Sequence, residues 1–116
     1  SEPEKIVPTF NSVSSVPKNI ETQIGNYMAP IGKKTFIQQI EVSGENIAKY
    51  RVEIGGQTSR TKRTYFGGEL NLVFDFDAYS KSGLEILPGT FIKIFVEHNR
   101  PDSSDFESYI QTLEIG

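Results

Sequence analysis

The chain contains no cysteine and no tryptophan, and it has a single histidine. The absence of cysteine excludes disulfide bonds, thiolate zinc sites and a cysteine nucleophile. No apolar run approaches the roughly 20 residues that a membrane-spanning helix needs, so we expect no membrane insertion. Fifteen acidic residues against twelve basic ones give a formal net charge of −3. Because this balance lacks the basic surface typical of nucleic-acid binding, we also expect no nucleic-acid partner.

Short stretches of alternating apolar and polar residues dominate what is present. A period of two places successive side chains on opposite faces of a β-strand. A length of 116 residues corresponds to one domain. Turn signals separate the stretches about every ten residues, which is typical of all-β domains. The clearest alternating stretches are residues 20–24, 36–42, 48–54, 70–76 and 106–110.

The pattern predicts an all-β domain of about eight or nine short strands. Each sheet has one apolar face to cover, so a two-sheet antiparallel sandwich follows. The number of strands does not choose between a jelly-roll and an immunoglobulin-like topology. The immunoglobulin core signature of cysteine, tryptophan and cysteine is missing, which gives a true immunoglobulin domain little support.

Two glycine pairs mark tight turns, because glycine adopts positive φ without steric cost. Gly55-Gly56 predicts a compact hairpin. Gly67-Gly68 predicts a second hairpin over residues 63–76, whose second arm drives Leu and Phe side chains into the core. Residues 91–96 are apolar on both faces and predict a central strand.

The division of the chain is predicted as an N-terminal arm over residues 1–16 and a β-sandwich domain over residues 17–116. The arm can pair in part as an edge strand, because Pro8 lacks the amide donor that a central strand needs. The arm could also add a strand to a neighbouring subunit. We expect the sandwich to fold without it.

Candidate catalytic and metal-binding groups are sparse. His98 could act as a base beside Asp102 or Asp105, but no serine nucleophile accompanies it in a recognisable order, so a structural role is favoured. No glycine-rich phosphate loop is present. We therefore expect no enzyme and no cofactor. Oxygen donors near two loops could hold calcium, although loop caps explain them as well; they are Asp75, Asp77, Asp102, Asp105 and Glu107.

Two sets of side chains could instead contact a partner. A basic set could meet an acidic surface, or could protect an exposed sheet edge from self-association; it comprises Lys49, Arg51, Arg60, Lys62 and Arg63. An aromatic set could stack on sugar rings, or could form core and cross-strand pairs; it comprises Tyr27, Tyr50, Tyr65, Phe66, Tyr79 and Tyr109.

Three segments together resemble small β-sandwich structural proteins of tailed bacteriophages. They are SGENIAKYRVEIGGQ (43–57), KRTYFGGELNLVFDF (62–76) and GLEILPGTFIKIFVEHNRPDSSDFES (83–108), and the KRTYFGG and HNRPDSSDFE runs are the most distinctive. Residues 1–28 take no part in the resemblance. It implies a non-enzymatic virion protein, most readily a repeated collar or baseplate component of a long tail. A capsid decoration protein is the alternative.

The resemblance also implies partners and a location. Other virion proteins would bind the chain within a homo-oligomeric ring or lattice, and the protein would be found in the virion after assembly in the host cytoplasm. A carbohydrate-binding adhesion module, with a host-surface glycan as ligand, is the alternative from a different functional class. No catalytic residue carries over. The residues predicted to contact a partner are Arg60, Lys62, Arg63, Tyr65, Phe66, His98, Arg100 and Asp102.

Overall fold

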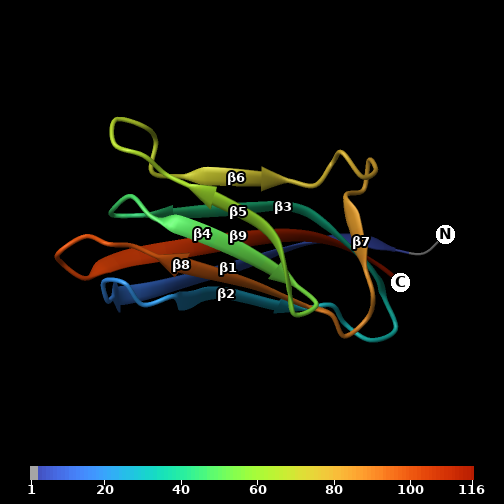
Figure 1. The fold of residues 1–116 in the computed structure, drawn as a ribbon. Helices are drawn as coiled ribbons and strands as arrows, with labels where there is room; N and C mark the ends of the chain where they lie inside the picture. Colours follow the sequence, from blue (N-terminus) through green and yellow to red (C-terminus); the bar gives the residue numbers. More distant parts are fainter. Residues whose placement is uncertain (1–2) are drawn as a thin grey trace.

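The computed structural model describes residues 3–116, which form nine strands and no helix (Figure 1). Because the described part has no helix, it has none long and apolar enough to cross a membrane. The strands are β1 (Glu4–Val16), β2 (Thr22–Met28), β3 (Lys34–Gly44), β4 (Lys49–Ile54), β5 (Gln57–Arg63), β6 (Leu72–Asp75), β7 (Leu84–Ile86), β8 (Phe91–Glu97) and β9 (Ser104–Ile115).

The strands form two antiparallel sheets packed face to face. In sheet A the order is β1-β9-β3-β6, with β7 pairing a different stretch of β3, and in sheet B the order is β2-β8-β4-β5. Most neighbours in the chain lie in different sheets at matching positions, as in β1 and β2 or β8 and β9, while β4 and β5 share sheet B and β6 and β7 share sheet A. This is the jelly-roll arrangement. The predicted two-sheet antiparallel sandwich is confirmed, and the topology left open by the sequence is resolved.

The core is built from the inward sets of the alternating strands. Ile40 and Phe74 pair across β3 and β6, and Val52 and Ile94 pair across β4 and β8. All four side chains have 0% of their surface exposed. Residues 91–97 form β8 between β2 and β4, so the predicted central strand is confirmed.

The predicted hairpin over residues 63–76 is wrong, although the Gly55-Gly56 hairpin between β4 and β5 is correct. β5 lies in sheet B and β6 in sheet A, so residues 64–71 cross between the sheets. A turn does form there, with Gly67 at φ 79° and the Gly68 amide donating to the Tyr65 carbonyl at 3.0 Å. The two arms separate after the turn because β6 pairs with β3, not with β5.

The predicted N-terminal arm forms β1, the edge strand of sheet A. It pairs with β9 from Glu4↔Ile115 to Val16↔Ser104, with one irregularity between Val13 and Val16. This pairing runs further than the partial pairing that was predicted. Residues 1 and 2 of the predicted arm lie outside the described residues.

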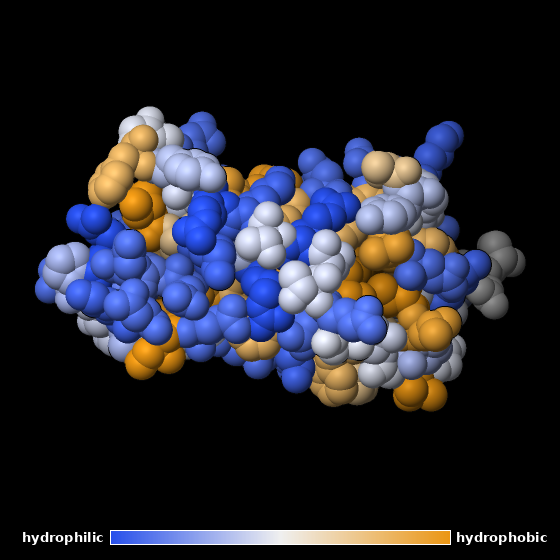
Figure 2. Space-filling model, in the orientation of Figure 1, coloured by the Kyte–Doolittle hydropathy of each residue, from blue (hydrophilic) through white to orange (hydrophobic). Residues whose placement is uncertain are grey.

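The molecule is elongated, with extents of 52 × 24 × 21 Å. The ribbon places the start of β1 and the C-terminus at one end and the β3–β4, β5–β6 and β8–β9 connections at the other (Figure 1). The surface at this other end is mostly hydrophilic with a few apolar residues (Figure 2). We call this second end, formed by residues 45–48, 64–71 and 98–103, the loop end. It collects the most distinctive runs of the phage-like resemblance.

Candidate functional site

The loop end is held together by hydrogen bonds between segments that are far apart in the chain. The Asp105 amide donates to a Glu45 carboxylate oxygen at 2.6 Å, and the Asn46 side-chain amide donates to the Ser104 hydroxyl at 2.6 Å. The Ala48 amide donates to the Thr64 hydroxyl at 2.8 Å. These bonds tie the three connections to one another, so the loop end presents a defined surface.

Tyr65 and Phe66 form the apolar part of that surface, with 68% and 75% of their area exposed. The Arg100 guanidinium lies 5.0 Å from the centre of the Phe66 ring, within the range of a cation–π interaction. Two hollows of about 420 and 260 Å³ adjoin this surface, and both aromatic residues line both hollows. Exposed aromatic residues beside an arginine are a composition typical of protein–protein interfaces.

His98 belongs to the interior of the loop end and not to its surface. Only 2% of the residue is exposed, and its Nε2 lies 2.8 Å from the Val16 carbonyl oxygen. The Arg100 amide donates to Nδ1 at 3.2 Å, which assigns the proton to Nε2. The imidazole is therefore enclosed, with no face for a partner. Among the described residues neither Asp102 nor Asp105 is hydrogen-bonded to it, so the catalytic pairing considered from the sequence does not form.

Arg60 and Lys62 serve the sandwich itself at the rim where β5 faces β6. Arg60 donates to the Asp75 carbonyl at 3.0 Å and lies 4.5 Å from the centre of the Phe76 ring. The Lys62 amine donates to the Val73 carbonyl at 2.8 Å and lies 5.1 Å from the Phe74 ring. Both cations thus bind free carbonyls of an edge strand in the opposite sheet. This is the edge-protecting role weighed for the basic set.

Arg63 and Asp102 are exposed, and Arg63 lines the larger hollow. Four of the eight predicted contact residues therefore meet around the two hollows with their side chains accessible: Arg63, Tyr65, Phe66 and Arg100.

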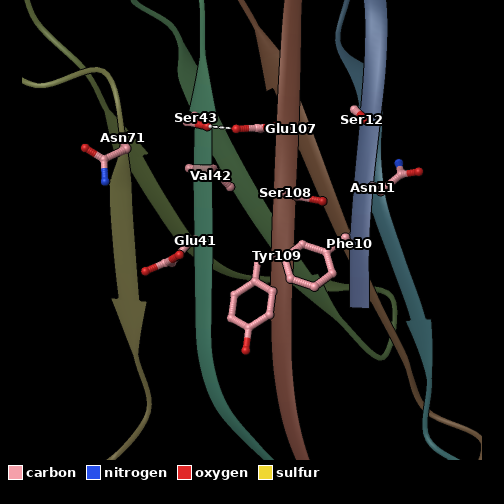
Figure 3. A pocket seen from close by; sticks show the side chains of 10 residues that line it. All are labelled: Phe10, Asn11, Ser12, Glu41, Val42, Ser43, Asn71, Glu107, Ser108 and Tyr109. Carbon is pink, nitrogen blue, oxygen red and sulfur yellow. Dashed lines mark hydrogen bonds between the residues drawn. The ribbon is translucent and has the colours of Figure 1, made fainter. Parts of the chain in front are cut away.

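A second candidate surface lies on the outer face of sheet A, where sequence reasoning did not place a site. The ladder aligns Phe10, Tyr109 and Glu41 in one row across β1, β9 and β3. The next row holds Ser12, Glu107 and Ser43. Figure 3 shows these side chains around a groove that reaches from β1 to Asn71 beside β6. Its volume is about 600 Å³.

The groove combines an aromatic pair with polar groups that keep free hydrogen-bonding capacity. The Phe10 and Tyr109 rings lie 4.8 Å apart at a tilt of 37°, and 76% of Phe10 is exposed. Glu107 accepts from the Ser43 hydroxyl at 2.8 Å through one oxygen, and Glu41 accepts from the Gln39 amide at 3.0 Å through one oxygen. The second oxygen of each carboxylate has no partner among the described residues.

The outer face of sheet B differs, because its polar groups are engaged with one another. Arg51 donates to Glu21 at 2.7 Å and to Glu53 at 2.9 Å, and its guanidinium lies 4.3 Å from the Phe95 ring. The hydrogen bond from Arg51 lowers the pKa of Glu21, and these carboxylates, Glu21 first, raise the pKa of Arg51. Arg51, Glu21 and Glu53 thus form a closed network on this face, unlike the carboxylates of the groove.

The sequence could have revealed the groove only in part. Tyr109 belonged to the aromatic set, and Glu107 to the oxygen donors considered for calcium. Phe10 carried no signal, because its segment was read as an arm. Within residues 3–116 no group of three or more histidine or acidic side chains is arranged to hold a metal ion.

Comparison with known proteins adds little to this geometry. No protein-family model matches the chain, and no curated protein matches it. Among solved structures, the chain is similar to the CBM36-1 domain of a multidomain xylanase from the hindgut metagenome of Trinervitermes trinervoides. The identity is 16%, the alignment covers 98% of this chain and 97% of that chain, and the TM-score is 0.43. At this level the similarity carries no argument about what the chain binds.

Proposed function

We propose that this protein is a non-enzymatic structural component of a tailed-bacteriophage virion, a repeated collar or baseplate subunit of a long tail. The observation that supports the proposal is the meeting of the phage-like runs in space. KRTYFGG and HNRPDSSDFE lie far apart in the chain, yet Phe66 of the first carries Arg100 of the second against its ring at 5.0 Å. The most distinctive sequence thus coincides with the exposed aromatic and cationic surface.

The proposed role assigns docking to the loop end. Tyr65, Phe66, Arg63 and Arg100 would be buried against a neighbouring virion protein, since exposed aromatic and arginine side chains contribute most to interfaces. A ring of such subunits needs contacts that close around an axis. A small sandwich can still be monomeric when it is isolated from the ring. A capsid decoration protein would use the same surface on an icosahedral lattice.

Incorporation of variants into particles tests this assignment. Phe66→Ala and Arg100→Ala should fold normally and should lower incorporation at least about tenfold, because truncating an interface anchor typically costs 2 kcal/mol or more. Leu87→Ala is the matched control, since Leu87 is 73% exposed and precedes β8, away from the loop end. Equal incorporation of the three variants would overturn docking through the loop end.

Carbohydrate recognition is a second candidate function, and the groove on sheet A is the observation that favours it. Its volume of about 600 Å³ is in the range of small-ligand sites. Ring faces that can pack on the C–H surface of a sugar lie beside carboxylate, amide and hydroxyl groups that can bind its hydroxyls. Retention of the protein in native gels that contain soluble polysaccharides, against the same gels without them, tests this function. Unchanged mobility with every polysaccharide would remove it.

A further inference from the structure

The charge of the groove narrows the class of glycan that it can take, if the second candidate function holds. Glu41 and Glu107 project into the groove, and no lysine or arginine lines it. Asp75 aligns with Gln39 in the next row of the same face. An acidic sugar chain would therefore bring its carboxylates or sulfates next to fixed negative charges, which is unfavourable at close range.

The direction of the groove determines how a bound oligosaccharide would lie on the sheet. The lining side chains come from β1, β9, β3 and the start of β6, so the groove crosses the strands instead of following one of them (Figure 3). Four neighbouring strands span about 14 Å at the usual separation. The groove opens to solvent, because Phe10, Ser12 and Glu107 along it are exposed. It can accept an internal stretch of a polymer as well as a chain end.

The two ends of the groove offer different chemistry. The Phe10 ring lies between β1 and β9 with the Tyr109 ring beside it, so apolar ring packing is available from the β1 side to the middle of the groove (Figure 3). Glu41 and Asn71 lie toward β6, where hydrogen bonds to hydroxyl or amino groups are available (Figure 3). The Tyr109 hydroxyl donates to the Gln111 amide oxygen at 2.7 Å, and the Gln111 amide donates to Gln38 at 2.7 Å. These bonds hold the Tyr109 ring in place before any ligand arrives, which limits the entropy lost on binding.

We propose that the outer face of sheet A binds an uncharged or amino-bearing oligosaccharide lying across β1, β9, β3 and β6, and that it excludes acidic glycans. Tyr109 and Phe10 supply the apolar platform. Glu107, Glu41 and Asn71 supply hydrogen bonds, and the two carboxylates set the preference for charge. This inference rests on the carbohydrate-binding function and adds the ligand class to it.

The test compares three probes by isothermal titration calorimetry with the full chain: cello-oligosaccharides as neutral chains, chitosan oligosaccharides as amino-bearing chains, and alginate oligosaccharides as acidic chains. We expect binding of a neutral or an amino-bearing probe and none of alginate. Tyr109→Ala should weaken that binding about tenfold or more through the loss of ring packing. Tyr109→Phe keeps the ring and should stay within about threefold.

Charge is tested separately with Glu107→Gln and Glu107→Lys. The amide keeps a hydrogen-bonding group and should preserve binding of the neutral chain, while the lysine variant should lose the amino-bearing chain and gain affinity for alginate. Gln23→Ala on sheet B is the control for surface substitution, and thermal unfolding confirms that each variant is folded.

The outcomes separate the inference from the function on which it rests. Binding of alginate by the native chain, weakened by Tyr109→Ala, would overturn the charge preference and leave glycan recognition standing. Binding that Tyr109→Ala and Phe10→Ala do not change would overturn the groove as the site. Failure of all three probes, together with unchanged mobility in the polysaccharide gels, would overturn both the inference and the second candidate function.

Discussion

At the scale of single residues, buried polar side chains in this sandwich differ in whether they have hydrogen-bond partners. His98 has partners at both ring nitrogens, so its burial leaves no polar atom unpaired. Tyr50 is fully buried, and its hydroxyl has no hydrogen-bond partner among the described residues. The Tyr50 ring contributes to core packing, because it lies edge-to-face on Phe106 with ring centres 6.1 Å apart. A buried hydroxyl without a partner costs stability, and burial also raises the pKa of Tyr50.

Tyr50→Phe should therefore stabilise the protein by about 1 kcal/mol, because the ring stays and the unpaired hydroxyl is removed. Urea denaturation at pH 7 measures this free energy. Tyr50→Leu is the control, since it removes both hydroxyl and ring and should destabilise. A Phe variant that is less stable than the native chain would show that the hydroxyl has a partner in solution.

The raised pKa of Tyr50 also predicts how the free energy of unfolding changes with pH in the alkaline range. Because the folded-state pKa is raised, Tyr50 ionises at a lower pH in the unfolded chain than in the folded one. Ionisation of Tyr50 therefore leaves the free energy of unfolding unchanged below about pH 10 and lowers it as pH rises further. The decline should be smaller in Tyr50→Phe, and part of it should remain because burial also raises the pKa of Tyr27. Thermal unfolding between pH 8 and 11 measures the difference. Identical pH profiles would contradict it.

At the scale of elements, the segment from β5 to β6 shows what a local pattern can and cannot predict. Alternation correctly placed Phe74 and Phe76 in the core, where both have 0% exposure. The glycine pair correctly marked a turn. Neither signal states which sheet receives the second arm, because that depends on pairing with β3, which is distant in the sequence. The sequence also left open whether Arg60 and Lys62 contact a partner or protect a sheet edge, since the β6 carbonyls that they bind come close to β5 only in the folded sandwich.

The β5–β6 rim should lose stability when its cations are removed. Lys62→Ala should cost about 1 kcal/mol, because it removes one hydrogen bond to the Val73 carbonyl and the contact with the Phe74 ring. The effect should change little with salt, since the acceptor is a carbonyl and not a carboxylate. Urea denaturation at low and high salt checks both statements. Lys81→Ala, at an exposed position between β6 and β7, is the control and should be near neutral.

At the scale of the whole molecule, the sequence predicted the sandwich and allowed only a partial edge pairing for its first strand. Each sheet has to cover an apolar face, and this argument holds without any knowledge of strand order. β1 was harder to interpret because it lies at an edge, where a proline and many polar residues are tolerated. The groove was missed with it, since one wall belongs to β1. The distinctive runs of the resemblance meet at the loop end, and their contact with a partner stays a prediction.

Removing residues 1–16 should prevent cooperative folding, contrary to the expectation of an independent sandwich. The deletion exposes the length of β9 and removes Val16, of which only 1% is exposed, from the core. Circular dichroism and thermal unfolding of the truncated chain measure the effect. Phe10→Ala is the control, because Phe10 is 76% exposed and its loss should leave unfolding nearly unchanged. A truncated chain that unfolds in one sharp transition near the native temperature would contradict this reading of β1.

The central proposal is that the protein is a repeated structural part of a virion. Single-particle electron microscopy of particles produced from the genome that encodes the chain tests it most directly. We expect density that fits the jelly-roll sandwich in a closed ring at the tail, with Tyr65, Phe66 and Arg100 against a neighbouring subunit. Particles that are complete and infectious without any copy of the protein would contradict the proposal.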